Sequence, residues 1–447
     1  MVSGGSLLVL IAITILFVVV ASSVAKIHPF LALLLAALGL GFAVGMPGGQ
    51  VLDTLAKGFG NITAGIGLII AFGTIIGVAL EESGAATRIA RALLSLFGSK
   101  RIVWAMSCIG GLVGIPVFCD SGFIILSKLV RTLAVQTGKS PVSLSMAMAG
   151  GLYTTHVLVP PTPGPLAAAA SYGAESYLGP VMLVGLLLSV PGVLTGYWWA
   201  VRSGKKSAPD ATGSAPSPHT EPPDPQAPPL LLSMLPLVLP VFLIGAGSIA
   251  GLMDPPSWLL FVCKPVMALF TGVLASFLLL RKGSGNRAEQ WVGKALSQAG
   301  PILLITAAGG SFGEVLKATP LTHLFESWVN SNTISGIWLL PMVFLLAAGL
   351  KTSQGSSTAA IIVTSSIFGP FLPALGISGP LELGILVSVT GAGSMVVSHA
   401  NDSYFWVVSQ FSGMTMKETL RTFTVSTLLQ GVAILAAAMI LFLLLPG

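Results

Sequence analysis

The chain has 447 residues, of which 54% are hydrophobic and only 8% are charged, and its formal net charge is +6. An ordinary globular protein carries about 25% charged residues, so this composition excludes a soluble protein and indicates an integral membrane protein. The basic residues lie beside the ends of apolar segments, so the positive charge indicates orientation in a membrane and not nucleic-acid binding.

Apolar segments with the length of a membrane-spanning helix, about 20 residues, recur along the chain. They cover about 5–25, 27–46, 62–82, 142–176, 178–201, 229–252, 257–280, 297–317, 381–412 and 423–446. The first has no basic segment before it and no clean cleavage site, so we expect a retained span and not a signal peptide. The predicted fold class is therefore an all-α polytopic membrane protein with about ten full spans.

Two further apolar segments, about 102–136 and 334–372, have awkward lengths for a single helix. Glycine and polar residues interrupt both near the middle, and a re-entrant hairpin that enters and leaves at one face fits each of them. The interrupting residues are Gly114, Pro116, Asp120 and Gly122 in the first segment, and Gly349, Lys351, Gln354 and Gly355 in the second.

The segments 142–176 and 381–412 are too long for plain spans, and we expect both to be broken helices. Non-helical sequence occurs at Pro160–Pro165 in the first, and at Gly391–Gly393 and His399–Ser403 in the second. Broken helices at membrane depth persist only where they line a cavity or are buried in protein. Both breaks are therefore expected at a binding site.

The basic residues support this layout. With non-crossing hairpins and the N-terminus outside, only Lys57, Lys264, Lys317 and Lys351 fall away from the cytoplasmic side. The positive-inside rule then predicts both termini outside.

Each half would contain three spans, a hairpin, a broken span and a final span, and an odd number of crossings would invert one half relative to the other. We predict a first repeat at 1–201, a disordered cytoplasmic linker rich in proline, serine and alanine at 202–229, and a second repeat at 230–447. Sequence similarity between the halves is weak: Gly77 aligns with Gly313 at an offset of 236.

In the first half, Asp120 precedes Ser121 and Gly122 at the hairpin tip. A carboxylate in this position could hold a proton or a cation, or it could cap a helix by accepting backbone N–H groups.

Thr155 and His156 precede the first break, in which Pro160, Pro161 and Pro163 prevent a continuous helix and flank Thr162. Backbone groups freed there could bind a polar solute or an ion. A buried histidine satisfied by its neighbours is the alternative.

In the second half, Lys351 must find an anion at membrane depth, and Glu314, Asp402 or a substrate carboxylate could supply it. Snorkelling to the interface is the alternative. Glu314 could instead make a structural helix contact. The residues that follow the lysine offer N–H and O–H donors at the start of a half-helix, which suits an anion. They include Gln354, Gly355, Ser356, Ser357 and Thr358.

The second break places four polar groups together. Asparagine and aspartate often bond their own backbone in turns, but the co-occurrence of four such groups at mid-membrane favours a functional site. They are His399, Asn401, Asp402 and Ser403. The three cysteines lack metal-ligand spacing and are interpreted as core residues, and we expect neither a metal nor a cofactor.

Four segments resemble the gluconate permease family of proton-coupled sugar-acid transporters. They are PVFCDSGFIIL (116–126), the pattern GLxxTHxxxPPxPGP (151–165), LKxxQGSSTAA (350–360) and SHANDSYFWVV (398–408). The resemblance extends from about residue 60 to 425. It implies the fold of the ion-transporter superfamily, with inverted repeats and paired hairpins, a homodimer and an elevator-type movement.

The family's polar positions fall on a set of residues in this chain that the resemblance marks as the site: Asp120, Thr155, His156, Gln354, Gly355, Ser356, His399, Asn401 and Asp402. The chain departs from the family at Thr162, where histidine is common, at Lys351, where arginine is frequent, and at Cys119, where an aromatic residue is more usual. Lysine cannot grip a carboxylate bidentately. This departure means that the resemblance does not specify gluconate itself, and we expect a small organic acid such as a gluconate-like aldonate or a related hydroxy acid.

The sequence as a whole predicts an importer of a small hydroxylated organic acid by proton symport in a bacterial inner membrane, and not an enzyme. In this hypothesis Lys351, Ser356, Ser357 and Asn401 hold the substrate, and Asp120, Thr155, His156 and Asp402 handle coupling and gating, with Glu314 as a further proton site. Sodium coupling through the Ser/Thr/Asn-rich tips and passive facilitation are the alternatives. An intramembrane hydrolase is a weaker one, because no nucleophile motif supports it.

Overall fold

The computed structural model describes residues 4–97, 101–204, 228–250, 256–280, 286–319, 336–400 and 402–445. Within these ranges every regular element is helical and no strand occurs. Among them, seven helices are long and apolar enough to cross a membrane, or eight if the pair Ser257–Cys263 and Pro265–Phe277, bent by 66°, forms one span. The predicted all-α class is confirmed, whereas the predicted ten full spans are not all recovered by length and hydropathy.

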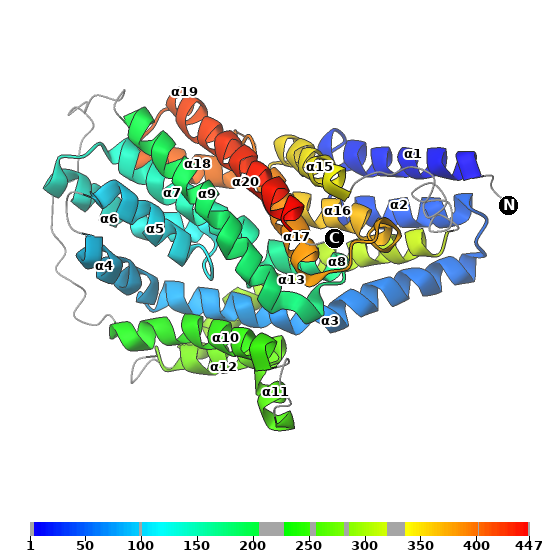
Figure 1. Cartoon of the computed structure of the whole chain (residues 1–447), viewed down its shortest axis with the longest axis horizontal. Helices are drawn as coiled ribbons and strands as arrows, with labels where there is room; N and C mark the ends of the chain where they lie inside the picture. The colour runs from blue at the N-terminus through cyan, green and yellow to red at the C-terminus, as the bar shows by residue number, and fades with distance from the viewer. Residues whose placement is uncertain are drawn as a thin grey trace.

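The first half of the chain forms nine α-helices and a short 3-10 helix, Glu175–Tyr177, within its described ranges (Figure 1). The α-helices are α1 (Gly4–Ser23), α2 (Pro29–Ala43), α3 (Gly48–Glu82), α4 (Ala85–Phe97), α5 (Ile102–Val113), α6 (Cys119–Thr137), α7 (Pro141–Leu158), α8 (Pro163–Ser171) and α9 (Leu178–Gly204). The predicted linker at 202–229 begins inside α9, and 205–227 lie outside the described residues.

The second half of the chain is also helical within its described ranges. Its helices are α10 (Leu230–Ala250), α11 (Ser257–Cys263), α12 (Pro265–Phe277), α13 (Arg287–Lys317), α15 (Leu339–Gln354), α16 (Ser357–Phe368), α17 (Pro380–Met395), α18 (Ser403–Ser412), α19 (Met416–Thr419) and α20 (Val425–Leu443). A π-helical turn, Leu420–Thr424, precedes α20.

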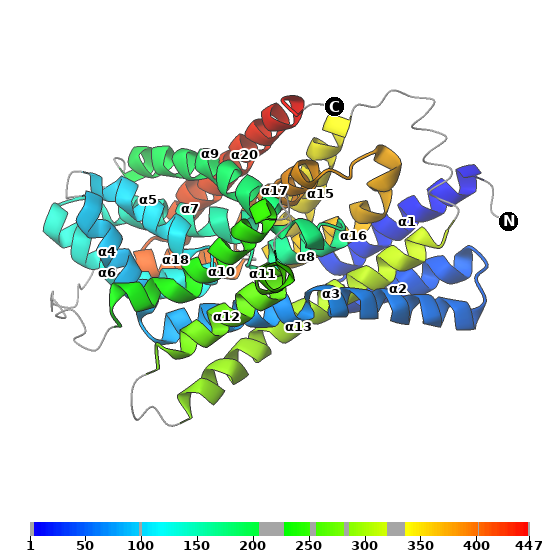
Figure 2. The same ribbon diagram turned by 60° about the horizontal axis from the view of Figure 1, so that its bottom comes forward.

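The long helices α3 and α13 lie side by side and antiparallel (Figures 1 and 2). Their backbones touch where Gly58 meets Gly310, because a Cβ on Gly58 would lie only 2.4 Å from the Gly310 carbonyl oxygen. On one side of this contact Lys57 pairs with Glu314 at 2.7 Å. Farther along the pair, Lys294 contacts Glu81 at 3.1 Å. Small residues at the crossing thus allow the close approach that ion pairs then fix.

Two helices are almost completely enclosed by the others. Every residue from Ser143 to Leu158 in α7 is buried, and so is every residue from Leu383 to Met395 in α17. Glycine allows them to meet closely, since a Cβ on Gly391 would lie 2.0 Å from the carbonyl oxygen of Val157. By contrast, α9 and α10 expose large apolar side chains such as Leu183 and Phe242, as expected of helices that face lipid. The two enclosed helices carry the chain into both breaks.

Both breaks occur as predicted, but they are shorter than expected. The first covers 159–162, because Pro163 and Pro165 lie in the first turn of α8, where proline needs no hydrogen-bond partner for its nitrogen. The second covers 396–402, since α17 continues through Gly391–Gly393, which serve close packing and not helix breaking.

Both hairpins turn among the residues predicted, at Gly114–Val117 and Gly355, but the helices include the other predicted residues. Helix α15 continues through Gly349 and Lys351 to Gln354, and the chain turns at Gly355, whose φ of +82° is the left-handed conformation that glycine adopts readily. In the first hairpin α5 ends before Gly114, and α6 begins at Cys119, so that Asp120 lies in the first helical turn.

Candidate functional site

A buried ion pair joins the second hairpin to the second break. Lys351 Nζ lies 2.6 Å from Asp402 Oδ2, and the two side chains are 0% and 5% exposed. Lys351 occupies the last turn of α15, whereas Asp402 is the N-cap of α18 and accepts the backbone N–H of Tyr404 at 3.1 Å. Of the two protein carboxylates considered for this lysine, Asp402 and not Glu314 contacts it. The full burial of Lys351 excludes snorkelling.

The remaining contacts of Lys351 hold its ammonium group in place. Nζ donates to the carbonyl oxygen of Gly355 at 2.9 Å and lies 5.7 Å from the ring centre of Tyr153. A ring face at this distance attracts a cation. The carboxylate of Asp402 is also held in place, because the Ser398 hydroxyl donates a hydrogen bond to its Oδ2.

Tyr153 and Tyr404 form an aromatic wall on one side of this pair. Their ring centres are 5.1 Å apart, and Phe423 lies 5.4 Å from Tyr404. The Tyr153 hydroxyl lies 2.6 Å from Ser357 Oγ at the start of α16, and the Tyr404 hydroxyl donates to the carbonyl oxygen of Ala149. Sequence reasoning missed both tyrosines, although each lies inside a motif that was singled out for its polar neighbours.

Asp120 reaches the same region from the first hairpin. Its Oδ2 accepts the hydroxyl of Ser403 at 3.1 Å, and its Oδ1 is buried without a hydrogen-bond partner. Ser403 follows Asp402 directly, so the second break connects the two carboxylates. The capping alternative is not what the structure shows, because the N-cap of α6 is Phe118. Ser121 and Gly122 follow in α6, where Gly122 packs against Leu152.

The first break contributes His156, which lies against the first hairpin and not against the ion pair. Its ring centre is 5.6 Å from that of Phe118, and its Nδ1 is buried without a hydrogen-bond partner. Thr155 donates to the carbonyl oxygen of Gly151 at 3.3 Å, and Thr162 donates to that of Val159 at 2.6 Å. Both threonine hydroxyls are thus bonded to the backbone, whereas the imidazole nitrogen of His156 is unpartnered.

A further contact joins the second hairpin to the second break. His399 Nε2 lies 2.8 Å from the carbonyl oxygen of Thr352. Ser356 is the N-cap of α16, since its hydroxyl accepts the N–H of Ala359. Ser356 is exposed, and Thr358 is half-buried. Asn401 lies outside the described residues.

Glu314 does not join this cluster. Its carboxylate pairs with Lys57 of α3 at 2.7 Å, at an ion pair whose lysine is 67% exposed. The structure thus supports the alternative of a structural helix contact for Glu314.

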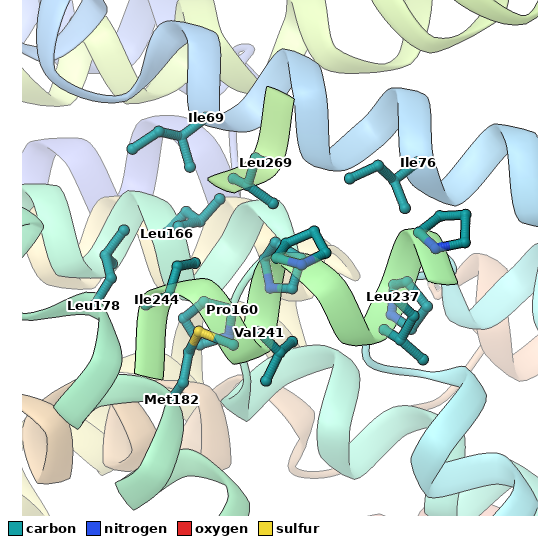
Figure 3. A pocket seen from close by; sticks show the side chains of 14 residues that line it. Ile69, Ile76, Pro160, Leu166, Leu178, Met182, Leu237, Val241, Ile244 and Leu269 are labelled. Atoms are coloured by element: carbon teal, nitrogen blue, oxygen red, sulfur yellow. The ribbon is translucent and has the colours of Figure 1, made fainter. Parts of the chain in front are cut away.

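An apolar pocket lies beside the first break (Figure 3). Its lining combines Pro116 of the first hairpin turn and Pro160 and Pro161 of the break with side chains of α3, α9, α10 and α12, such as Met182 and Ile244. These side chains offer nothing that binds a carboxylate. The polar cluster around Lys351, Asp402 and Asp120 is therefore the candidate site.

A family model described as GntP family permease matches residues 6–445. The gluconate permease of Pseudomonas aeruginosa is 32% identical over 426 residues, which cover 92% of each chain. The Gnt-II system L-idonate transporter of Escherichia coli is 31% identical and covers 90% of this chain and 91% of its own. The gluconate permease of Bacillus subtilis is 30% identical, with 98% and 99% covered.

Solved transporters share the fold. The protein MtrF of Neisseria gonorrhoeae, described as illuminating a class of antimetabolite efflux pumps, has a TM-score of 0.70 at 14% identity and covers 96% of this chain and 97% of its own. The YdaH transporter of Alcanivorax borkumensis has a TM-score of 0.66 at 16% identity, with 93% and 98% covered. These likenesses concern the fold alone. The family match and the apolar helices make the chain a multi-pass membrane protein and a permease, not an enzyme, and it belongs to the GntP permease family.

Proposed function

We propose that the chain is a secondary active transporter that imports a small hydroxylated organic acid by proton symport. The observation that carries this proposal is the buried Lys351–Asp402 ion pair. The carboxylate of Asp120 lies nearby and accepts a hydrogen bond from Ser403, the residue that follows Asp402. A buried ammonium group suits the carboxylate of an organic acid, and carboxyl groups beside it are suited to bind and release a proton. The relatives named as gluconate permeases and as an L-idonate transporter support a sugar acid as the substrate.

Within this proposal the second hairpin and second break form the substrate site. Lys351 binds the carboxylate, and Ser356, Ser357 and Asn401 contact the hydroxyl groups, joined by the Tyr153 hydroxyl that the structure places beside Ser357. Further contacts to the acid come from residues around the two breaks and from the second hairpin tip: Thr155, His156, Thr162, His399, Gln354, Gly355 and Thr358. Asp120 and Asp402 carry the coupling proton. Glu314 is left out, because Lys57 already neutralises it away from the cluster.

The proposal includes a mechanism of alternating access with two inverted repeats, 1–201 and 230–447, joined by the linker 202–229. The two ion pairs between α3 and α13 support it. When the sequences of the halves are aligned at the offset of 236, the position of Lys57 corresponds to the residue just before Lys294, and that of Glu314 to the third residue before Glu81. A two-fold axis relating the halves would therefore bring each ion pair close to the position of the other. We further propose a homodimer, elevator-type movement, and an inner-membrane location with both termini outside.

Uptake of radiolabelled gluconate, L-idonate, glycerate and a neutral sugar into proteoliposomes tests the function. We expect one of the acids to accumulate above equilibrium under an inward proton gradient, and a protonophore to abolish the accumulation. Accumulation that follows a sodium gradient at constant pH would replace proton coupling by sodium coupling. Equilibration without accumulation would identify a passive facilitator and contradict the proposal.

A further inference from the structure

We propose that Asp402 is an internal competitor for the substrate carboxylate at Lys351, and that the exchange of these two anions on one ammonium group couples transport to proton uptake. This inference rests on the proposed function and adds a mechanism to it. It makes Asp402 the residue that decides whether the lysine is open to substrate.

The first step is the demand of Lys351 for an anion. Its side chain is 0% exposed and touches a single carboxylate, Asp402, at 2.6 Å among the described residues. A buried charge without a partner is strongly unfavourable, so the ammonium group must be neutralised in every state of the transport cycle. In the structure, Asp402 performs this task.

The second step is the position of Asp402 in a non-helical segment. It ends the break at 396–402, and Oδ2 receives hydrogen bonds from both Lys351 and Ser398. The break is itself anchored to α20, because the Ser398 N–H donates to Thr427 Oγ1 at 3.2 Å. When a substrate carboxylate replaces Asp402 at Lys351, Ser398 and the Tyr404 N–H still hold the aspartate side chain. The anion can therefore leave the lysine without leaving the site.

The third step is charge balance. The substrate arrives as an anion and forms the ion pair with Lys351, and Asp402 accepts one proton to become a neutral carboxylic acid. The net charge of the site is then the same before and after loading. One proton would accompany each monocarboxylate.

Several ionisable groups face Asp402 besides the lysine. Asp120 and Cys119 approach from α6, Tyr153 from α7, and Tyr404 from its own helix, while Lys351 is the cation among these groups. With the substrate on the lysine, two ionised carboxylates, Asp402 and Asp120, would lie near one another without a cation of their own. Ser403, which donates to Asp120, links the two acids along the chain.

The substitution Asp402→Asn tests the inference. Asparagine caps a helix as well as aspartate does, so the bond to the Tyr404 N–H is retained while the competing charge is removed. Because Lys351 is then always open to substrate, gluconate should bind about tenfold tighter or more, with little dependence on pH. Counterflow of gluconate between equal concentrations should persist, whereas accumulation driven by a proton gradient should be lost. Equilibrium binding of radiolabelled gluconate in detergent and proteoliposome uptake measure these effects.

Glu81→Gln is the matched control, since it also removes a carboxylate paired with a lysine, and Lys294 keeps Glu82. This variant should bind and accumulate gluconate as the wild type does. If Asp402→Asn unfolds, the double variant Lys351→Met/Asp402→Asn, which removes both charges, should fold and bind no gluconate. A folded double variant that still binds gluconate would overturn the inference.

The outcomes separate this inference from the proposed function. If the wild-type protein accumulates no acid, the proposed function fails, and the inference fails with it. If the wild type is proton-coupled but Asp402→Asn accumulates gluconate equally well, only the inference fails. Loss of gluconate binding in a folded Asp402→Asn protein would also overturn it, because Asp402 would then be a ligand and not a competitor.

Discussion

The hydroxyl oxygen of Tyr153 lies 2.6 Å from that of Ser357, and this hydrogen bond joins the enclosed helix α7 to the first turn of α16. The same tyrosine ring lies beside the ammonium group of Lys351. The contact therefore connects the first half of the chain to the hairpin that presents the lysine.

Tyr153→Phe and Ser357→Ala should each lower the free energy of unfolding by about 1 kcal/mol, and the double variant should lose little more, since both remove the same bond. Because this bond borders the proposed substrate site, we expect both single variants to raise KM for the transported acid severalfold. Tyr172→Phe is the matched control, as its hydroxyl pairs with Thr390 at 2.7 Å. Tyr172→Phe should lower the free energy of unfolding by a similar amount without raising KM. A rise in KM equal to that of Tyr153→Phe would contradict a local role for Tyr153.

Gly310→Ala should destabilise the α3–α13 pair. The added Cβ would lie 2.3 Å from Ile62 Cγ1 and 2.7 Å from the Gly58 carbonyl oxygen, so the helices would have to separate. We expect a loss of about 1–3 kcal/mol in the free energy of unfolding. Gly293→Ala, an exposed position on the same helix with nothing within 4 Å of the added Cβ, should gain about 0.5–1 kcal/mol. Thermal unfolding in detergent distinguishes the two, and equal effects would argue against close contact at Gly310.

Lys351→Met should leave Asp402 buried without a cation. We expect a loss of about 3–5 kcal/mol in the free energy of unfolding and no measurable uptake of acid. Lys57→Met removes the lysine of a partly exposed pair and should cost far less stability than Lys351→Met, with uptake retained. Wild-type uptake by a folded Lys351→Met protein would show that the substrate carboxylate binds elsewhere.

Gln430 of α20 joins several helices by hydrogen bonds at a place separate from the Lys351–Asp402 ion pair. Its side-chain amide donates to Thr154 Oγ1 at 2.9 Å and to the carbonyl oxygens of Gly150 and Gly192, both at 3.1 Å. Gln430→Leu should cost about 3 kcal/mol in the free energy of unfolding, because it leaves buried acceptors unpaired. The KM of the protein that remains folded should be unchanged, and a large rise in KM at normal stability would assign Gln430 to the site.

The sequence predicted the elements of this fold well, because apolar length and proline position are local properties of the chain. It placed both breaks and both hairpins, yet it ended α17 and α15 too early. Gly391 and Gly349 suggest helix breaks locally, whereas in the structure each lies within a continuous helix. Tertiary contact, which no local pattern contains, explains Gly391.

The site was predicted only in part, because it depends on contacts between distant segments. The predicted membrane depth of Lys351 showed that it needs an anion. The choice between Asp402 and Glu314 depends on how α13 and α18 pack, and spacing along the chain does not reveal this packing. Tyr153 and Tyr404 were missed because an aromatic residue in a membrane helix is normally interpreted as part of the core. Their role beside the ion pair follows only from the distances between α7, α15 and α18.

The thiol of Cys119 adds a practical consequence. It precedes Asp120 at the start of α6 and is 7% exposed in this structure. A maleimide reagent can reach it only in a state that admits water to the first hairpin tip. In a variant in which Cys108 and Cys263 are replaced, the rate of labelling at this native position would report how often the transporter opens, and the addition of substrate would show which state it favours.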